Sequence, residues 1–157
     1  MTDADRSALL LHTDEGYRAT VYDDATGEPI VSGYTVRGTP TIGYGINVGV
    51  GGGITPDEAT YLFGNRLATV RQRLAVYPWY TAMDDVRRAA VENMAFNLGI
   101  MGFLGFHQTI YRFSVQDWSG AAAAILASEA ARSPATADRY ARLARMIATG
   151  EWPAGAE

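Results

Sequence analysis

Two carboxylates near the start of the chain, Glu15 and Asp24, are candidates for the pair of acids that cleaves a glycosidic bond. Glu15 stands at the end of an apolar helical pattern and precedes Gly16, whereas Asp24 closes a run that favours extended backbone. A turn at Gly16 would bring two acids in different environments towards each other, as in a glycosidase. The alternative is a helix terminus followed by a solvated acidic turn, because acidic residues are common on surfaces.

The segments around these carboxylates predict a helix followed by a small antiparallel sheet. Thr2 or Asp3 is suited to cap the first helix, and Gly16 is suited to end it. Branched and aromatic residues separated by turn-forming Asp, Gly and Pro then favour short strands. Three strands are predicted, over residues 17–22, 30–36 and 41–49.

The third predicted strand carries glycines on both sides of Tyr44. Gly43 and Gly45 would then share one face of the strand, because side chains alternate between faces. A face without side chains allows either close packing or the approach of a ligand to the backbone. The glycine-rich run at residues 49–53 does not fit a phosphate-binding loop, because no lysine follows it.

From Ile54 onwards the pattern becomes helical. Thr55 and Glu58 form a capping box that predicts a helix to about residue 75. Asp84 begins the most apolar helix, which is predicted to end at Gly99. Further helices are predicted over residues 115–131 and over a last segment that ends at Gly150. The fold class is therefore α+β.

Several polar side chains on the predicted helices have spacings that allow binding. Asn93 and Asn97 are four residues apart and share one helix face, which either lines a polar cleft or packs with its amides satisfied. Arg139, Arg142 and Arg145 recur at intervals of three. Such a row is ordinarily solvated, although one member could turn inward to meet a carboxylate.

Composition excludes several classes of function. The 157 residues carry a formal net charge of -4, which disfavours a nucleic-acid-binding surface. The chain has no cysteine and only two histidines, His12 and His107, so we expect no metal site and no cofactor. No apolar run reaches the ~18 residues of a membrane span. The N-terminus lacks the basic segment of an ordinary signal peptide.

Five motifs, in this order and spacing, resemble the phage-type lysozymes of glycoside hydrolase family 24. They are EGYRATVYDD, TIGYG, ITPDEATYLF, DVRRAAVENMAFNLG and TGEW. The resemblance covers almost the whole chain and implies a single lysozyme-like domain over residues 1–157, with a cleft between two lobes. The implied parts are an N-terminal helix, a sheet lobe at about 17–53, a connecting helix at about 55–75 and a helical lobe at about 78–157.

The resemblance assigns catalysis to three residues. Glu15 would be the general acid, Asp24 would hold or activate a water, and Thr41 would orient that water. Asp24, rather than its neighbour Asp23, matches the catalytic aspartate. The segment between Asp24 and Thr41 is longer than in the T-even phage enzyme, so it must extend either the sheet or a loop.

The resemblance also assigns substrate-side and supporting residues. Asn93 matches a cleft-facing asparagine, and Asn97 lies where many relatives have a glutamine that contacts substrate. Arg139 matches an arginine that supports the catalytic glutamate, although a nearby cation lowers the pKa of a carboxyl group and opposes its role as an acid. Tyr44, within TIGYG, is also assigned to substrate binding or to support of the site.

The implied activity is that of a muramidase acting on the glycan strands of bacterial peptidoglycan during phage-type cell lysis. A non-catalytic peptidoglycan-binding module and a lytic transglycosylase are the alternatives. We expect a monomer with no nucleic-acid partner, made in the host cytoplasm and acting on the cell wall. It would reach the wall through holin-dependent release or be carried in the virion.

Overall fold

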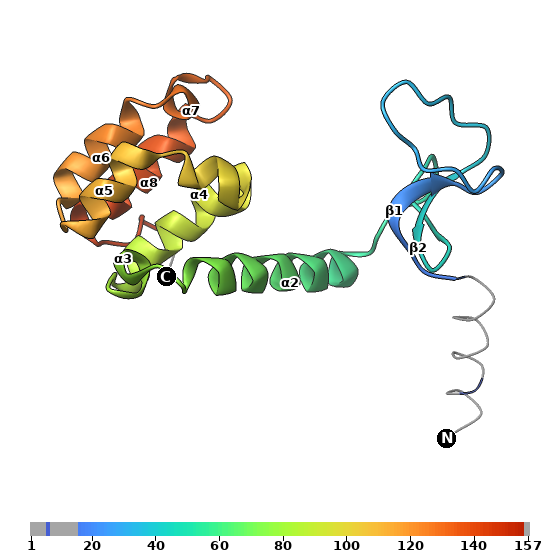
Figure 1. Ribbon diagram of the computed structural model, residues 1–157, viewed down its shortest axis with the longest axis horizontal. Helices are drawn as coiled ribbons and strands as arrows, with labels where there is room; N and C mark the ends of the chain where they lie inside the picture. Colours follow the sequence, from blue (N-terminus) through green and yellow to red (C-terminus); the bar gives the residue numbers. More distant parts are fainter. Residues whose placement is uncertain (1–5, 7–15, 156–157) are drawn as a thin grey trace. The chain divides into compact units, whose positions relative to one another are not determined.

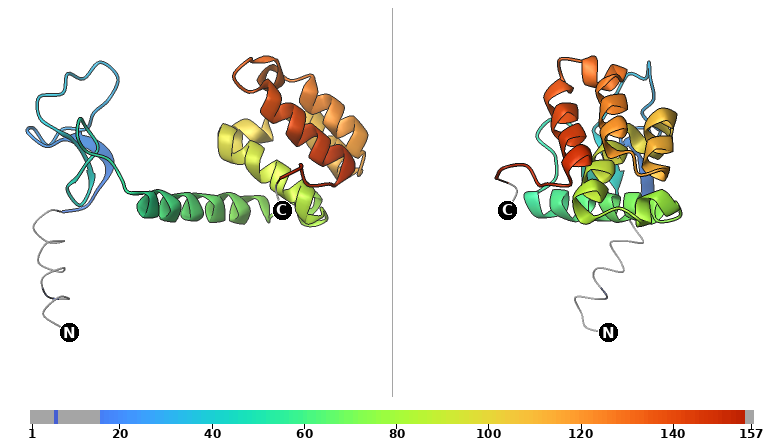
Figure 2. Two further views of the ribbon diagram at one scale, coloured as in Figure 1. Left: turned by 180° about the vertical axis from the view of Figure 1, so that it is seen from behind. Right: turned by 90° about the vertical axis from the view of Figure 1, so that its left-hand side faces the viewer.

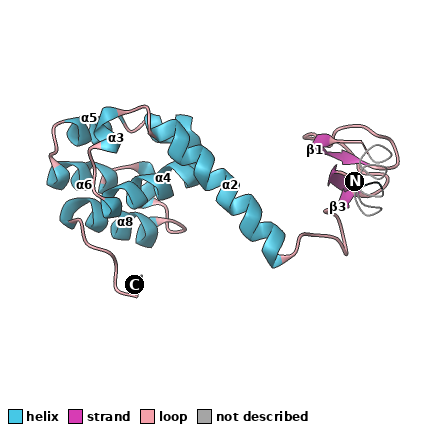
Figure 3. Ribbon diagram, turned by 90° about the horizontal axis from the view of Figure 1, so that it is seen from below, coloured by secondary structure: helices cyan, strands magenta, loops and turns pink. Residues whose placement is uncertain are grey.

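The computed structural model describes Arg6 and residues 16–155 of a chain that divides into two compact units. Met1–Thr60 forms the sheet unit and Tyr61–Glu157 forms the helical unit. The described strands all belong to the sheet unit, as the colouring of Figure 3 shows. The predicted α+β class, with a small antiparallel sheet and a larger helical part, is confirmed. The first predicted helix lies outside the described residues.

The sheet unit contains a three-stranded antiparallel sheet in the order β1-β2-β3 (Figure 1). In the β1–β2 ladder, Arg18 is opposite Gly43 and Asp23 is opposite Pro40. The ladder therefore ends beside Asp24. The strands are β1 (Arg18–Asp23), β2 (Pro40–Gly43) and β3 (Ile46–Asn47).

The strand predicted over residues 30–36 is not formed, and this prediction was wrong. The only pairing near it is an isolated bridge between Tyr22 and Pro29. The physical reason is that the Asp23 carboxylate accepts hydrogen bonds from the Arg37 and Gly38 amides, which folds the segment into a loop. Of the two alternatives for the long Asp24–Thr41 segment, the structure therefore has the loop.

The strand predicted over residues 41–49 is instead a hairpin, β2 and β3, with its turn at Tyr44 and Gly45. Gly43 and Gly45 have φ values of 68° and 73°, a backbone region that favours glycine. The two glycines therefore serve the turn. The argument that they share one face of a continuous strand was wrong.

The helix predicted after the glycine run is confirmed as α2 (Pro56–Leu74). The capping box is present, because the Thr55 amide donates to Glu58 Oε2 at 2.7 Å and the Glu58 amide donates to Thr55 Oγ1 at 3.3 Å. A short helix, α3 (Pro78–Thr81), follows it.

The apolar helix α4 (Asp85–Leu104) begins as predicted, because the Asp84 side chain accepts a hydrogen bond from the Arg87 amide at 2.9 Å. At Gly99 the backbone leaves helical geometry (φ 72°, ψ 156°), and the helix resumes after this kink. The predicted end at Gly99 is thus a break within a longer element.

The later helices differ from prediction in their number. The sequence did not predict α5 (His107–Ser114). The helix predicted over residues 115–131 is two helices, α6 (Trp118–Leu126) and α7 (Glu129–Arg132). Asp117 and Ser128 each cap a new helix through their side-chain oxygens, which divides the segment. The last helix, α8 (Ala137–Thr149), ends at Gly150 as predicted, with φ 70°.

The buried apolar core lies in the helical unit, where α6 and α8 pack side by side and α4 packs on α8 (Figure 2). Among the described helices none is both long and apolar enough to cross a membrane by itself. The bent pair α4 and α5, 98° apart, meets that test only when taken together. Side chains of α4 and α8 that are fully or almost fully buried include Val91, Met94, Phe103, Tyr140, Leu143 and Ile147.

Candidate functional site

Asp24 and Thr41 are both held by the backbone of one residue, Thr39. Asp24 Oδ1 accepts a hydrogen bond from the Thr39 amide at 2.5 Å, and the Asp24 amide donates to the Thr39 carbonyl at 3.1 Å. Thr41 Oγ1 donates to the same carbonyl at 3.0 Å. Two of the three predicted catalytic residues are thus hydrogen-bonded to the backbone of the same residue. The sequence did not indicate this role of Thr39.

The two side chains keep hydrogen-bonding capacity for a ligand. Asp24 is exposed, and its Oδ2 accepts no hydrogen bond from the described residues. Thr41 is buried, but its hydroxyl is a donor to Thr39 and so retains lone pairs that can accept. Asp24 Oδ2 and Thr41 Oγ1 are therefore both able to accept a hydrogen bond from a ligand.

Asp23, the neighbour that we did not assign to catalysis, is fully buried and organises the loop. Its carboxylate accepts hydrogen bonds from the amides of Arg37 (2.6 Å), Gly38 (2.9 Å) and Ala25 (3.1 Å), and from the Tyr34 hydroxyl (3.2 Å). The four donors come from both ends of the loop. The Asp23 carboxylate therefore closes the loop on which Asp24 is presented.

The same hydrogen bonds set the acidity of Asp23. The Arg37 amide makes the largest contribution and, with the Ala25 and Gly38 amides, holds the pKa of the Asp23 carboxyl group below its ordinary value against the opposing effect of burial. Asp23 is thus ionised at neutral pH and acts only as an acceptor.

Gly38 lies so close to Asp24 that no other residue fits without movement. A Cβ atom at position 38 would collide with Asp24 Oδ1 and would lie 2.6 Å from the Ala25 Cβ and 2.8 Å from the Ala25 amide nitrogen. The absence of a side chain at Gly38 is therefore a condition for the observed position of the Asp24 carboxylate.

Glu15, the predicted general acid, lies outside the described residues, so its place in the site stays a prediction. Tyr44 is described and lies in the β2–β3 turn, with its ring 5.4 Å from that of Tyr17. The described residues include no group of three or more His, Cys, Asp or Glu side chains that could hold a metal ion.

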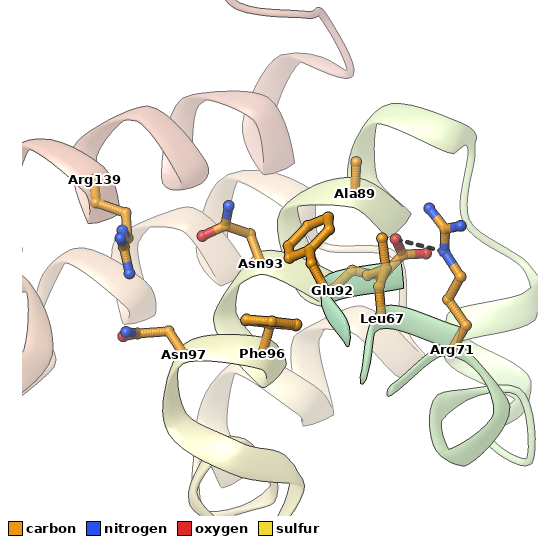
Figure 4. A pocket seen from close by; sticks show the side chains of 9 residues that line it. Leu67, Arg71, Ala89, Glu92, Asn93, Phe96, Asn97 and Arg139 are labelled. Atoms are coloured by element: carbon orange, nitrogen blue, oxygen red, sulfur yellow. Dashed lines mark hydrogen bonds and ion pairs between the residues drawn. The ribbon is translucent and has the colours of Figure 1, made fainter. Parts of the chain in front are cut away.

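The remaining predicted site residues line one pocket of about 580 Å³ in the helical unit (Figure 4). Asn93 and Asn97 come from α4, and Arg139 comes from α8, on the same side of the pocket. Phe63, Leu67 and Phe96 provide its apolar wall. The pocket thus combines amide and guanidinium donors with apolar surface, which suits a ligand that presents both.

Arg139 differs from the two other arginines of its row. It is partly buried and faces this pocket, whereas Arg142 and Arg145 are exposed on α8. One member of the row has thus turned inward, and its meeting with a carboxylate stays a prediction. Arg139 does not pair with Glu92. Glu92 forms an ion pair with Arg71 at the opposite end of the pocket (Figure 4).

The sequence analysis missed Glu92, which is almost fully buried. Glu92 Oε1 accepts the Tyr80 hydroxyl at 2.7 Å, and Oε2 accepts Arg71 Nε at 2.9 Å. Burial, and then the neighbouring Glu92, raises the pKa of Tyr80 to about 12. A glutamate within the most apolar helix was the available signal, because a carboxylate on a buried face requires partners.

Comparison with known proteins identifies a family. The family model for phage lysozyme matches residues 12–133. The pre-baseplate central spike protein Gp5 of Enterobacteria phage T4 is 32% identical over 131 residues, which cover 73% of this chain and 23% of that protein. The chain therefore spans less than a quarter of the length of this relative.

Proposed function

The chain belongs to the phage lysozyme family, and on this premise we propose that it is a muramidase. It hydrolyses the β-1,4 bond between N-acetylmuramic acid and N-acetylglucosamine in bacterial peptidoglycan. The observation that carries the proposal is the shared attachment of Asp24 and Thr41 to Thr39, which presents a carboxylate oxygen and a hydroxyl oxygen as acceptors. Such a pair suits the binding of a nucleophilic water.

In the proposed reaction, Glu15 donates its proton to the glycosidic oxygen as the bond to the anomeric carbon breaks. A water whose hydrogens are accepted by Asp24 and Thr41 directs its lone pair at the same carbon. Asp24 takes the proton of the attacking water and, while ionised, stabilises the positive charge that develops on the sugar. Direct attack by this water predicts inversion at the anomeric carbon.

The pocket of the helical unit has the donors that a peptidoglycan strand needs. Asn93 and Asn97 can pair with N-acetyl and hydroxyl groups, while Phe96 offers an apolar surface to a sugar ring. We assign Arg139 to substrate contact in this pocket. A role of Arg139 beside Glu15 would lower the pKa of that carboxyl group and favour its ionised form, so there Arg139 would fix geometry instead of keeping the acid protonated.

Mass spectrometry of digested peptidoglycan tests the proposal. A muramidase leaves reducing muramic acid ends, a lytic transglycosylase leaves anhydromuramic ends, and a binding module leaves the strands intact. Glu15→Gln and Asp24→Asn should each lower the rate by roughly a hundredfold or more. The control is Ser32→Ala, which alters an exposed residue of the loop beside Asp24. Full activity in the Glu15→Gln or Asp24→Asn variant would disprove the assignment of that residue.

The similarity to a central spike protein supports a second proposal, on location. A domain of this family can belong to a larger virion-borne protein, as the name of that relative indicates. We propose that the chain acts on the cell wall either from the virion or as an endolysin released through a holin. Mass spectrometry of purified virions separates the two, because only the first route places this chain in the particle.

A further inference from the structure

The loop between β1 and β2 (Figure 1) forms a pocket of about 550 Å³ that belongs wholly to the sheet unit. Ligand sites in proteins commonly have volumes of roughly 300–1,000 Å³. Two of the lining side chains are charged, Glu28 and Arg37, and the others are neutral. The neutral lining residues are Thr26, Gly33, Tyr34 and Thr35. We call this space the loop pocket.

One residue, Asp23, holds the backbone of both charged residues. The Asp23 amide donates to the Glu28 carbonyl at 3.0 Å, and Asp23 Oδ2 accepts a hydrogen bond from the Arg37 amide at 2.6 Å. Asp23 itself is fully buried at the end of β1. The backbone therefore fixes the two places from which the charged side chains extend before any ligand binds.

A chain of hydrogen bonds fixes the neutral wall of the loop pocket. The Glu28 amide donates to Thr26 Oγ1 at 3.2 Å, and Thr26 Oγ1 lies 2.7 Å from the Tyr34 hydroxyl. The Tyr34 hydroxyl in turn donates to Asp23 Oδ2 at 3.2 Å. A phenol has one proton to donate, so Thr26 is the donor to Tyr34. The Tyr34 ring is thus held in place as an apolar part of the lining.

The two charged side chains are unpaired within the described part of the chain. No ion pair joins Glu28 to Arg37, and neither side chain forms a hydrogen bond with a described residue. The charges nearby are engaged elsewhere, because Arg18 donates to the Gly27 carbonyl at 3.0 Å and Asp23 accepts hydrogen bonds from the loop. A zwitterionic ligand pairs with both charges of the pocket, whereas a singly charged ligand leaves one of them without a partner.

The loop pocket adjoins the candidate site through three consecutive residues. Arg37 lines the pocket, and Gly38 packs on the Asp24 carboxylate. The amide of the next residue, Thr39, donates to Asp24. In the proposed reaction the sugar attacked beside Asp24 is N-acetylmuramic acid, which is also the sugar that carries the peptide stem of peptidoglycan. The stem therefore begins beside the loop pocket.

We infer that the loop pocket binds the free end of a diamino acid in the peptide stem, an inference that rests on the proposed function. meso-Diaminopimelic acid, when it is not cross-linked, carries an ammonium group and a carboxylate on one carbon at its free end. In the pocket Arg37 pairs with this carboxylate and Glu28 pairs with the ammonium group. Lysine, the diamino acid of other cell walls, has only the ammonium group at this end. The loop pocket therefore favours stems that contain diaminopimelate.

Two soluble ligands that differ in one group test the inference. They are N-acetylmuramoyl-L-alanyl-D-isoglutamyl-meso-diaminopimelate and the same compound with L-lysine as its third amino acid. In calorimetric titrations the unaltered protein should bind the diaminopimelate compound roughly fivefold more tightly, as expected for one additional exposed ion pair.

Two variants assign the preference to the two charges. Arg37→Gln should abolish the preference and leave binding of the lysine compound unchanged, because that compound lacks the carboxylate. Glu28→Gln should weaken binding of both compounds, because both carry the ammonium group. Neither change alters the backbone contacts with Asp23. Arg73→Gln, which removes an exposed cation from α2, is the matched control and should keep the preference.

An NMR titration of the unaltered protein completes the test without relying on the folding of a variant. The Arg37 Nε–H signal should shift with the diaminopimelate compound. Equal affinity for the two compounds, or a preference that survives Arg37→Gln, would overturn the role of the loop pocket. A protein that shows the preference but cleaves no peptidoglycan would support the loop pocket and refute the proposed muramidase. Cleavage without the preference would refute the loop pocket alone.

Discussion

Different kinds of side chain are buried in the helical unit and in the described part of the sheet unit. In the described part of the helical unit the buried side chains are aliphatic or aromatic apart from Glu92 and Thr109. In the described part of the sheet unit they are those of two polar residues, Asp23 and Thr41. Apolar packing is non-directional, whereas each acceptor of a carboxylate fixes a donor in one direction. The first arrangement stabilises a scaffold, and the second positions a loop and the Asp24 carboxylate on it.

The largest effect on stability should come from the apolar core. Phe103→Ala removes a fully buried ring from α4 and should lower the free energy of unfolding by about 3–5 kcal/mol. Chemical denaturation followed by circular dichroism measures this change. Leu126→Ala, at a half-exposed position on α6, is the control and should cost far less. An equal loss in both variants would contradict the location of the core.

The next effect should appear in activity instead of stability. Gly38→Ala places a methyl group against Asp24 and should displace its carboxylate, which lowers the rate of peptidoglycan hydrolysis by roughly a hundredfold. The helical unit should keep its unfolding transition. Ser32→Ala, at an exposed position of the same loop, is the control. An active Gly38→Ala variant would mean that the carboxylate position is not critical.

The conformation of the loop should change with pH as the Asp23 carboxyl group gains or loses its proton. Its pKa in the folded protein is lowered, so its stabilising effect is complete above the ordinary aspartate pKa of about 4 and is lost as pH falls through the lower folded value. The Arg37 and Gly38 amide signals should therefore shift in one step below pH ~4, as measured by NMR. Asp23→Asn should remove this step. A step that persists in Asp23→Asn must come from another group.

The same hydrogen bonds decide whether Asp23→Asn can serve as a control for Asp24→Asn. Asp23 is not assigned to catalysis, but a variant at this position is a neutral control only if the loop keeps its conformation. The Asn amide nitrogen would instead replace an acceptor oxygen and face backbone donors, so the loop should be disturbed. Asp23→Asn is consequently a poor control for catalysis.

The smallest effect concerns two buried hydroxyl groups of the helical unit. The Tyr140 hydroxyl has no hydrogen-bond partner among the described residues, so Tyr140→Phe should change the free energy of unfolding by at most about 1 kcal/mol, in the stabilising direction. The Tyr80 hydroxyl donates to Glu92, so Tyr80→Phe should destabilise by about 1–3 kcal/mol. Equal effects in thermal or chemical denaturation would contradict this difference.

The sequence predicted best what depends on local signals. The capping box at Thr55 and Glu58, the cap at Asp84 and the end of the last helix at Gly150 are each decided within a few residues, and all three are present. The loop at 30–36 was mispredicted as a strand because its conformation depends on Asp23, which is distant in sequence.

The candidate site shows the same difference between features set by local sequence and features set by contacts between distant residues. Helical spacing placed Asn93 and Asn97 on one face, and both line the pocket with Arg139. Spacing could not indicate that Thr39 joins Asp24 to Thr41, because the contacts involve main-chain atoms that every residue except proline possesses. The choice of Asp24 over Asp23 rested on the resemblance and stays a prediction; the structure buries the Asp23 side chain and leaves Asp24 exposed.

The main-chain role of Thr39 has a consequence for sequence variation and design. An amide and a carbonyl hold Asp24 and Thr41, so the identity of the side chain at position 39 is unconstrained by these contacts. In a saturation library at this position, substitutions of many kinds should retain function, whereas proline, which lacks the N–H group, should be depleted. Position 39 can therefore diverge freely among homologues and is a suitable point for introducing a label beside the site.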